Sequence, residues 1–213
     1  MLSVIKSMGL QGLDGYLINV EVDVANGMPN WEIVGLPDVS LRESKERVRT
    51  AIRNIGYDFP SRRIVVNLAP ANTKKEGSLF DLPIAIGILI DNGYIKQQNL
   101  EKTVFIGELS LDGKLNKVKG VLPITIEAKK MGIERIILPK ENVKEASVIE
   151  HIQIIGIDNL TQVVNYLNGT EKIQAFENTD KILNDSEYDI DFADVKGQEN
   201  VKRAIEIAVA RIS

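Results

Sequence analysis

One segment of this chain carries a row of cationic side chains. Residues 40–55 have apolar side chains at helical spacing, and Gly56 follows as a stop signal. The cations are three, four and four residues apart, which places them on one helix face. They are Arg42, Lys45, Arg49 and Arg53. Such a row can follow a nucleic acid's phosphate backbone. The alternative is an ordinary solvated face, paired with Glu43 and Glu46.

Positive charge continues beyond this helix. Residues 40–75 contain nine lysines and arginines but three acids, a local charge of +6 in a chain whose net charge is −4. The cations after the helix complete the predicted DNA-binding set: Arg62, Arg63, Lys74 and Lys75. Residues 171–194 are the reverse, with eight acids and two lysines. The local positive charge keeps DNA possible as a partner despite the acidic overall balance.

The end of the chain has the pattern of a turn followed by a helix. Asp194, Gly197 and Gln198 can form a turn that caps a helix. Apolar residues at helical spacing then predict one buried face: Val201, Ala204, Ile205 and Ala208. The segment resembles the one that precedes the phosphate loop in AAA+ ATPases. That loop, G-x-x-x-x-G-K-[ST], is absent from all 213 residues, so the alternative is a terminal helix with no nucleotide role.

Two patterns of apolar residues, alternation and helical spacing, predict the strands and helices that position these residues. Alternation over residues 17–24 predicts a half-buried strand, with residues 31–36 as its partner and Trp31 in the core. The remaining strands are expected at residues 62–68, 103–109, 114–118, 135–138 and 151–157, with helices at 80–90, 121–131, 141–148 and 160–167. This order is too irregular for a doubly wound sheet. We expect an α/β fold of the α+β kind, a mixed sheet with helices on one face.

Two segments resemble the proteolytic domain of Lon-type proteases. The first is KKEGSLFDLPIA at residues 74–85; the second is GELSLDGKL at 107–115, continuing as GIERIILPKEN at 132–142. The resemblance implies a Lon-protease-like domain of the ribosomal-S5-domain-2-like fold. With GLPD at residues 35–38 and the AAA+-like end, nearly the whole chain resembles the N-terminal part of ComM-type proteins, which are magnesium-chelatase-like AAA+ ATPases. Because their phosphate loop follows at this point, we expect a truncated chain.

The resemblance also implies that the protease chemistry is lost. Lon proteases use a serine nucleophile and a lysine base, and the matching positions here are Leu79 and Leu122. An alignment shifted by one residue would make Ser78 the nucleophile, with Lys117 or Lys119 as the base. We instead expect Ser78 to cap the buried helix that follows it.

Composition argues against several kinds of site. The chain has no cysteine, which removes disulfides and thiolate chemistry, and a single histidine, which has no second histidine to share a metal. No run of ~18 apolar residues suggests a membrane span, and the N-terminus lacks a secretory h-region. We therefore expect a cytoplasmic protein with no metal site and no membrane partner.

Three parts are predicted: an inactive Lon-like domain at 1–168, an acidic linker at 169–190 and the start of an AAA+ domain at 191–213. By resemblance, the intact protein is a hexameric ring ATPase that promotes branch migration in recombination and natural transformation. ATP and magnesium are implied for that parent, with Asp194, Gly197 and Gln198 near the adenine. This chain is expected to be a DNA-binding or ring-assembly platform without enzyme activity. The alternatives are an active Ser-Lys peptidase using Ser78 and a pure oligomerisation or adaptor module.

Overall fold

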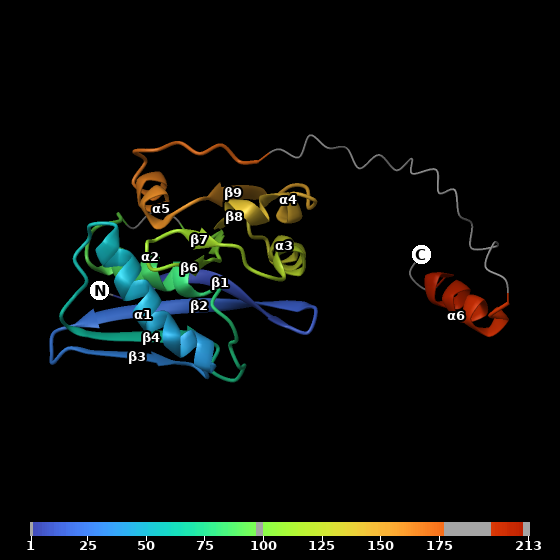
Figure 1. Cartoon of the computed structure of the whole chain (residues 1–213), viewed down its shortest axis with the longest axis horizontal. Helices are drawn as coiled ribbons and strands as arrows, with labels where there is room; N and C mark the ends of the chain where they lie inside the picture. The colour runs from blue at the N-terminus through green and yellow to red at the C-terminus, as the bar shows by residue number, and fades with distance from the viewer. Residues whose placement is uncertain (1, 97–99, 177–196, 211–213) are drawn as a thin grey trace. The chain divides into compact units, whose positions relative to one another are not determined.

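A seven-stranded mixed sheet forms the centre of the larger of two compact units (Figure 1). The units are Met1–Asn178 and Thr179–Ser213, and the computed structural model describes residues 2–96, 100–176 and 197–210. The strand order is β3-β4-β2-β1-β5-β8-β9. The bounds are β1 (Ser3–Gln11), β2 (Asp14–Ala25), β3 (Asn30–Val34), β4 (Arg63–Ala69), β5 (Thr103–Phe105), β8 (Arg135–Pro139) and β9 (Gln153–Ile157).

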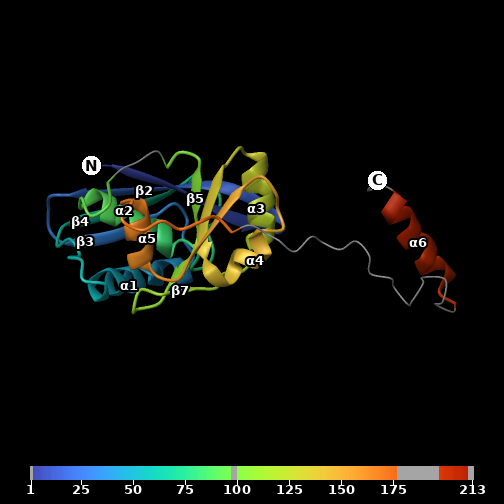
Figure 2. The same cartoon turned by 90° about the horizontal axis from the view of Figure 1, so that it is seen from above.

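Five helices accompany this sheet in the described part of the larger unit. They are α1 (Val39–Asn54), α2 (Asp81–Asp91), α3 (Val121–Lys130), α4 (Val143–Ala146, after a 3₁₀ turn at Lys140–Asn142) and α5 (Leu160–Leu167). Strand β2 runs antiparallel to β1 and β4, and the other neighbours in the sheet are parallel. Figure 2 shows α1 on one side of the β2–β4 strands. The prediction of a mixed α/β sheet is confirmed.

The helices cover the two halves of the sheet differently. In β2, Val20, Val22 and Val24 are buried on the side of α1 and α2, whereas Asp23 on the opposite face is exposed. In β8, Ile137 belongs to this same core, but Ile136 packs into a second core formed with α3 and α4. Consecutive apolar residues require both faces of a strand to be covered. The expectation of helices on one face therefore holds only for β3, β4 and the end of β2, because α3 packs against the start of β2, where Leu17 contacts the second core.

Strand pairing differs from the sequence expectation at three places. Strand β1 was missed, although it pairs with β2 along its whole length, from Ser3 opposite Val22 to Gln11 opposite Asp14. The strand containing Trp31 pairs with β4 rather than with β2, because β4 lies between them. The strand expected at residues 103–109 is divided: β5 stays in the main sheet, whereas β6 (Glu108–Leu109) pairs with β7 (Leu115–Asn116) as a separate hairpin.

The first residues of the predicted linker lie on the body. Residues 171–176, here called the strap, follow α5 and return along the edge strand β9, where the Phe176 amide donates to the Ile154 carbonyl at 2.9 Å. Ile173 and Ala175 of the strap pack against the main core. The larger unit accordingly runs to Asn178, beyond the expected boundary at residue 168. The rest of the predicted linker, 177–190, lies outside the described residues.

The smaller unit contains the predicted C-terminal helix, α6 (Glu199–Ala210). Gly197 and Gln198 precede it with φ angles of 74° and 61°, and the Gln198 carbonyl accepts the Val201 amide at 2.9 Å. The turn and the helix are thus confirmed. The expected buried face is not: Val201 and Ile205 are exposed, because the smaller unit has no other helix or strand among its described residues to pack on. No helix in the described chain is both long and apolar enough to cross a bilayer.

Candidate functional site

The predicted row of cations lies on the side of α1 that approaches the edge strand β3. Asp38 caps the helix by accepting the Leu41 amide at 2.8 Å. Leu41, Val48, Ala51 and Ile52 are fully buried and fix which face packs on the core. The four cations follow in the predicted order along the flank of α1 beside this face, where Lys45 and Arg49 are half-buried and Arg42 and Arg53 are exposed. Lys45 donates from Nζ to the backbone carbonyl of Trp31 in β3, so the row is tied to the sheet edge.

A small pocket opens between this face of α1, the start of β3 and the turn before β4. We call it the Trp31 pocket. It has a volume of about 250 Å³ and is lined by Pro29, Asn30, Trp31, Arg49, Arg53, Phe59, Pro60, Ser61, Arg62 and Ile64. Three of the eight predicted DNA-binding residues therefore meet in one place, although they come from two segments of the chain.

Two aromatic rings hold one of these arginines. The Trp31 and Phe59 rings pack with their centroids 5.0 Å apart. The guanidinium carbon of Arg49 lies 5.6 Å from the Trp31 centroid and 5.4 Å from that of Phe59, within the range of a cation–π interaction. Its Nη1 lies 3.4 Å from Glu46. Trp31 is core, as expected, with 6% exposure, but it has the aromatic partner that the sequence did not suggest.

The other two arginines of the Trp31 pocket are free. Arg53 and Arg62 are exposed, and neither has an ion-pair or side-chain hydrogen-bond partner within the described residues. No carboxylate is among the residues that line the pocket. The Trp31 indole nitrogen is buried and has no hydrogen-bond partner in the described structure. An unsatisfied buried N–H costs about 1–3 kcal/mol, so this donor is an unusual feature.

The remaining predicted cations are not brought together. Arg42 is exposed at the start of the row, but Arg63 helps line a different hollow, together with Glu21 and Asp23 of β2. Lys74 is exposed and pairs with Glu76 at 2.7 Å.

Lys75 is a clear exception to the predicted set. It has 0% exposure, and its ammonium donates to the Pro70 carbonyl. Burial lowers the pKa of this ammonium, because desolvation disfavours the charged form. Its side chain therefore lies beneath the surface and cannot contact a DNA phosphate without rearrangement.

The Lon-like dyad positions carry no group for covalent catalysis. Leu79 is partly buried against both cores, and Leu122 lies in the first turn of α3. The Ser78 hydroxyl bonds to the Glu108 carboxylate. Ser78 was expected to cap α2, and this was wrong: the helix has no side-chain cap, because that hydroxyl is engaged by Glu108. Lys117 and Lys119 are exposed on the segment between β7 and α3.

An ion pair beside these positions was missed from the sequence. Arg47 of α1 reaches Asp81 at the start of α2 through two hydrogen bonds, Nε to Oδ2 at 2.6 Å and Nη2 to Oδ1 at 3.1 Å. Asp81 has 0% exposure and also accepts the Leu109 amide at 3.1 Å. The hydrogen bond to Asp81 raises the pKa of Arg47. One signal was available: Arg47 lies off the cationic row, on the side of α1 that approaches α2.

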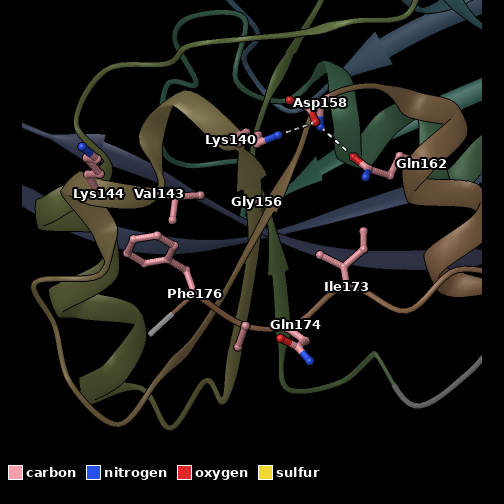
Figure 3. Close-up of a pocket in the computed structure, with 10 residues that line it drawn as sticks. Lys140, Val143, Lys144, Gly156, Asp158, Gln162, Ile173, Gln174 and Phe176 are labelled. Carbon is pink, nitrogen blue, oxygen red and sulfur yellow. Dashed lines mark hydrogen bonds and ion pairs between the residues drawn. The ribbon is translucent and has the colours of Figure 1, made fainter. Parts of the chain in front are cut away.

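A second hollow, of about 940 Å³, lies where the strap passes β9 and α4 (Figure 3). Lys140 pairs with Asp158 at 3.0 Å, and the Asp158 amide donates to Gln162 Oε1 at 2.9 Å. Gln162 in turn donates to Glu171 of the strap at 2.9 Å. This chain of contacts ties the strap to the body, which gives these polar groups a structural role.

The predicted nucleotide-adjacent residues cannot be assembled into a site here. Gly197 and Gln198 are exposed and lie in the smaller unit, and Asp194 lies outside the described residues. The described residues contain no group of three or more histidines and acids that could hold a metal ion. The motif G-x-x-x-x-G-K-[ST] does not occur in the 213 residues of the sequence.

The chain is similar in sequence to one protein family and to several known bacterial proteins. Residues 20–142 match the family model described as subunit ChlI of Mg-chelatase. Competence protein ComM of Haemophilus influenzae is 38% identical over 215 residues, which cover 98% of this chain and 42% of that protein. An uncharacterized protein of Mycobacterium tuberculosis is 37% identical over 204 residues, 96% of this chain and 40% of that protein.

A weaker similarity extends to Lon proteases. Lon protease 2 of Bacillus subtilis is 27% identical over 169 residues, which cover 71% of this chain and 30% of that protein. Both resemblances inferred from the sequence are therefore confirmed. The chain spans about 40% of the length of the curated relatives it matches with higher identity.

Proposed function

The chain belongs to the family described as subunit ChlI of Mg-chelatase, an AAA+ ATPase-like group, and we propose that it is the DNA-binding, non-proteolytic module of a longer ATPase. The observation that carries the proposal is the Trp31 pocket. It joins two free arginines, Arg53 and Arg62, to an arginine held on aromatic rings, Arg49. Cationic grooves with aromatic side chains are typical of surfaces that bind single-stranded nucleic acid.

The α1 row extends this surface. Arg42 and Lys45 continue along the same helix face from Arg49 and Arg53, over a helix of 16 residues. At a rise of 1.5 Å per residue, the eleven steps from Arg42 to Arg53 span about 16 Å. Binding by so short a surface is weak, and a ring of subunits would multiply it.

The activities of the longer protein belong to this proposal as well. One relative carries the name competence protein, which supports a role in DNA uptake and recombination, with branch migration as the proposed activity. ATP and magnesium would be bound by a phosphate loop outside this chain, and a cytoplasmic hexameric ring would present one Trp31 pocket per subunit. This chain alone would then hydrolyse no ATP.

The peptidase alternative is disfavoured by the arrangement around Ser78. Its hydroxyl is bonded to an acid, Glu108, rather than to a lysine. A carboxylate can accept a proton, but the Lon mechanism requires a lysine base, and Lys117 and Lys119 are solvated. The adaptor alternative is tested by the DNA-binding experiment described next, and it is favoured if the chain binds no DNA.

The proposal is tested with a fluorescent single-stranded oligonucleotide and charge reversal. We expect the parent chain to bind at about 50 mM salt, and Arg53→Glu with Arg62→Glu to weaken binding at least about tenfold. The matched control reverses two exposed cations outside the proposed surface, Lys117→Glu with Lys119→Glu, and should bind like the parent. Equal affinities for parent, pocket variant and control would reject the Trp31 pocket as the binding surface, and absence of any binding by the parent would favour the adaptor.

A further inference from the structure

We infer that the Trp31 pocket takes the terminal phosphate of a nucleic acid strand, an inference that rests on the proposed DNA-binding function and names the group bound at that site. The starting observation is the charge of the lining. Three guanidinium groups, from Arg49, Arg53 and Arg62, line a space of about 250 Å³, and no acid is among the lining residues. Arg49 is already paired with Glu46, but the charges of Arg53 and Arg62 have no such partner within the described residues, and an anion between these arginines relieves the repulsion among them.

The pocket is small, and its charge favours an anionic group. Ligand sites for drug-sized molecules measure about 300–1,000 Å³, so the volume of this pocket, about 250 Å³, lies below that range. It is walled by the turn before β3, by α1 and by the turn at residues 59–62, whose side chains lie around it. A strand end can enter such a hollow, whereas an internal phosphate would have to bring the chain in and out again.

The charge of the group follows from the same residues. A terminal phosphate monoester carries about −1.5 to −2 charges at neutral pH, whereas an internal phosphodiester carries one. Arginine binds phosphate through two parallel hydrogen bonds, and Arg53 and Arg62 have no other partner within the described residues to compete for them. The doubly charged group therefore gains more from this pocket than an internal phosphate does.

Arg49 is the conformationally restricted arginine of the pocket lining. Its guanidinium lies against the Trp31 and Phe59 rings, which restrict a side chain that otherwise loses much conformational entropy on binding. Phe59 is half-buried, so its ring also offers an apolar surface to the sugar or base that adjoins the phosphate.

The pocket contains its own reporter. Trp31 is the only tryptophan in the chain, so intrinsic tryptophan fluorescence reports on this site alone. Its indole N–H is buried without a partner, and an anion settling among the arginines changes the field at the ring directly. Binding measured by Trp31 emission is thus distinguished from binding elsewhere on the chain.

The test compares oligonucleotides of one sequence that carry a 5′-phosphate, a 3′-phosphate or two terminal hydroxyls, titrated into the full chain. We expect one phosphorylated form to bind about tenfold more tightly than the hydroxyl form and to change Trp31 emission. Arg53→Gln with Arg62→Gln should remove this preference, while Lys117→Gln with Lys119→Gln keeps it. The 5′ and 3′ arms show which strand end is recognised.

Two results separate this inference from the proposed function. If all three oligonucleotides bind equally and the arginine variant weakens all of them equally, DNA binding stands and the terminal-phosphate inference is overturned. If no oligonucleotide binds the parent, both are overturned. A phosphate preference that survives in the arginine variant would also overturn the inference, because the phosphate would then be bound elsewhere. Circular dichroism of each variant confirms that these exposed substitutions leave the fold intact.

Discussion

Arg47 and Asp81 join α1 to α2 through a two-pronged ion pair whose acid is completely shielded from solvent. Because Asp81 also accepts the Leu109 amide, this carboxylate connects three elements: both helices and the short strand β6. Asp81 lies two residues after Leu79, and Leu79 is the residue that stands where a Lon protease would have its nucleophile. In this chain Asp81, close to that dyad position, holds α1 and α2 together.

Removal of either partner should therefore be costly. We expect Asp81→Ala to lower the free energy of unfolding by about 3–5 kcal/mol, because it leaves the partly buried Arg47 charge with only the exposed Glu43 carboxylate, 3.9 Å away. Urea unfolding followed by circular dichroism measures this. The double variant Arg47→Met with Asp81→Leu should recover part of the loss, since it leaves no unpaired charge. A single variant as stable as the parent would show that the pair contributes nothing.

Peptidase activity should be absent. The Ser78 hydroxyl is bonded to Glu108, and the lysines that could serve as its base are exposed. We expect the chain neither to degrade casein nor to react with a fluorophosphonate probe. Ser78→Ala serves as the matched control, and labelling of the parent that disappears in this variant would restore the peptidase hypothesis.

The strap should be part of the folded unit. Ile173 and Ala175 pack on the core, and the Phe176 amide is bonded to β9. A chain ending at Asn178 should therefore have the same unfolding midpoint as the full chain. A chain ending at Asn168 should have a free energy of unfolding lower by about 1.5–3 kcal/mol, which is the contribution of burying one large aliphatic side chain. Equal stability of the two truncated chains would show that the strap only rests on the surface.

Lys75 should make stability depend on pH in the alkaline range. Its pKa in the folded state is lowered from the ordinary 10.5 by burial, so the charged ammonium opposes folding near neutral pH. As pH rises through the folded-state pKa toward 10.5, the folded chain needs to bury less charge, and stability relative to Lys75→Met should increase. Unfolding measured at several pH values tests this, with exposed Lys117→Met as the control. A difference that is independent of pH would contradict the burial.

Much of the fold could be predicted because its signals are local. Alternation over β2 and the helical stripe of α1 each identify one element, and Gly56, with φ of 89°, ends α1 as expected. Strand β1 gave a weaker signal, since it contains buried Ser3, Ser7 and Gly9 among its apolar residues. Ser7 is tolerated there because its hydroxyl donates to the Phe105 carbonyl at 2.8 Å, a contact between residues far apart in sequence.

The site was predicted less completely, for a related reason. The helical spacing of Arg42, Lys45, Arg49 and Arg53 fixes their common face, and the structure has them there. Nothing local shows that Arg62 joins this face whereas Lys75 is buried, because both outcomes depend on the turns that follow α1 and β4. The partner of Trp31, Phe59, is likewise defined only by tertiary packing.

The salt dependence of single-stranded DNA binding tests the central claim most directly. Each phosphate neutralised by a cation contributes about −0.7 to the slope of the logarithm of affinity against the logarithm of salt concentration. We predict a negative slope for the parent that becomes shallower by about 1.4, two phosphate contacts, in Arg53→Gln with Arg62→Gln. A slope that is the same in parent and variant, or affinity of the parent that does not change with salt, would contradict a DNA-binding surface at the Trp31 pocket.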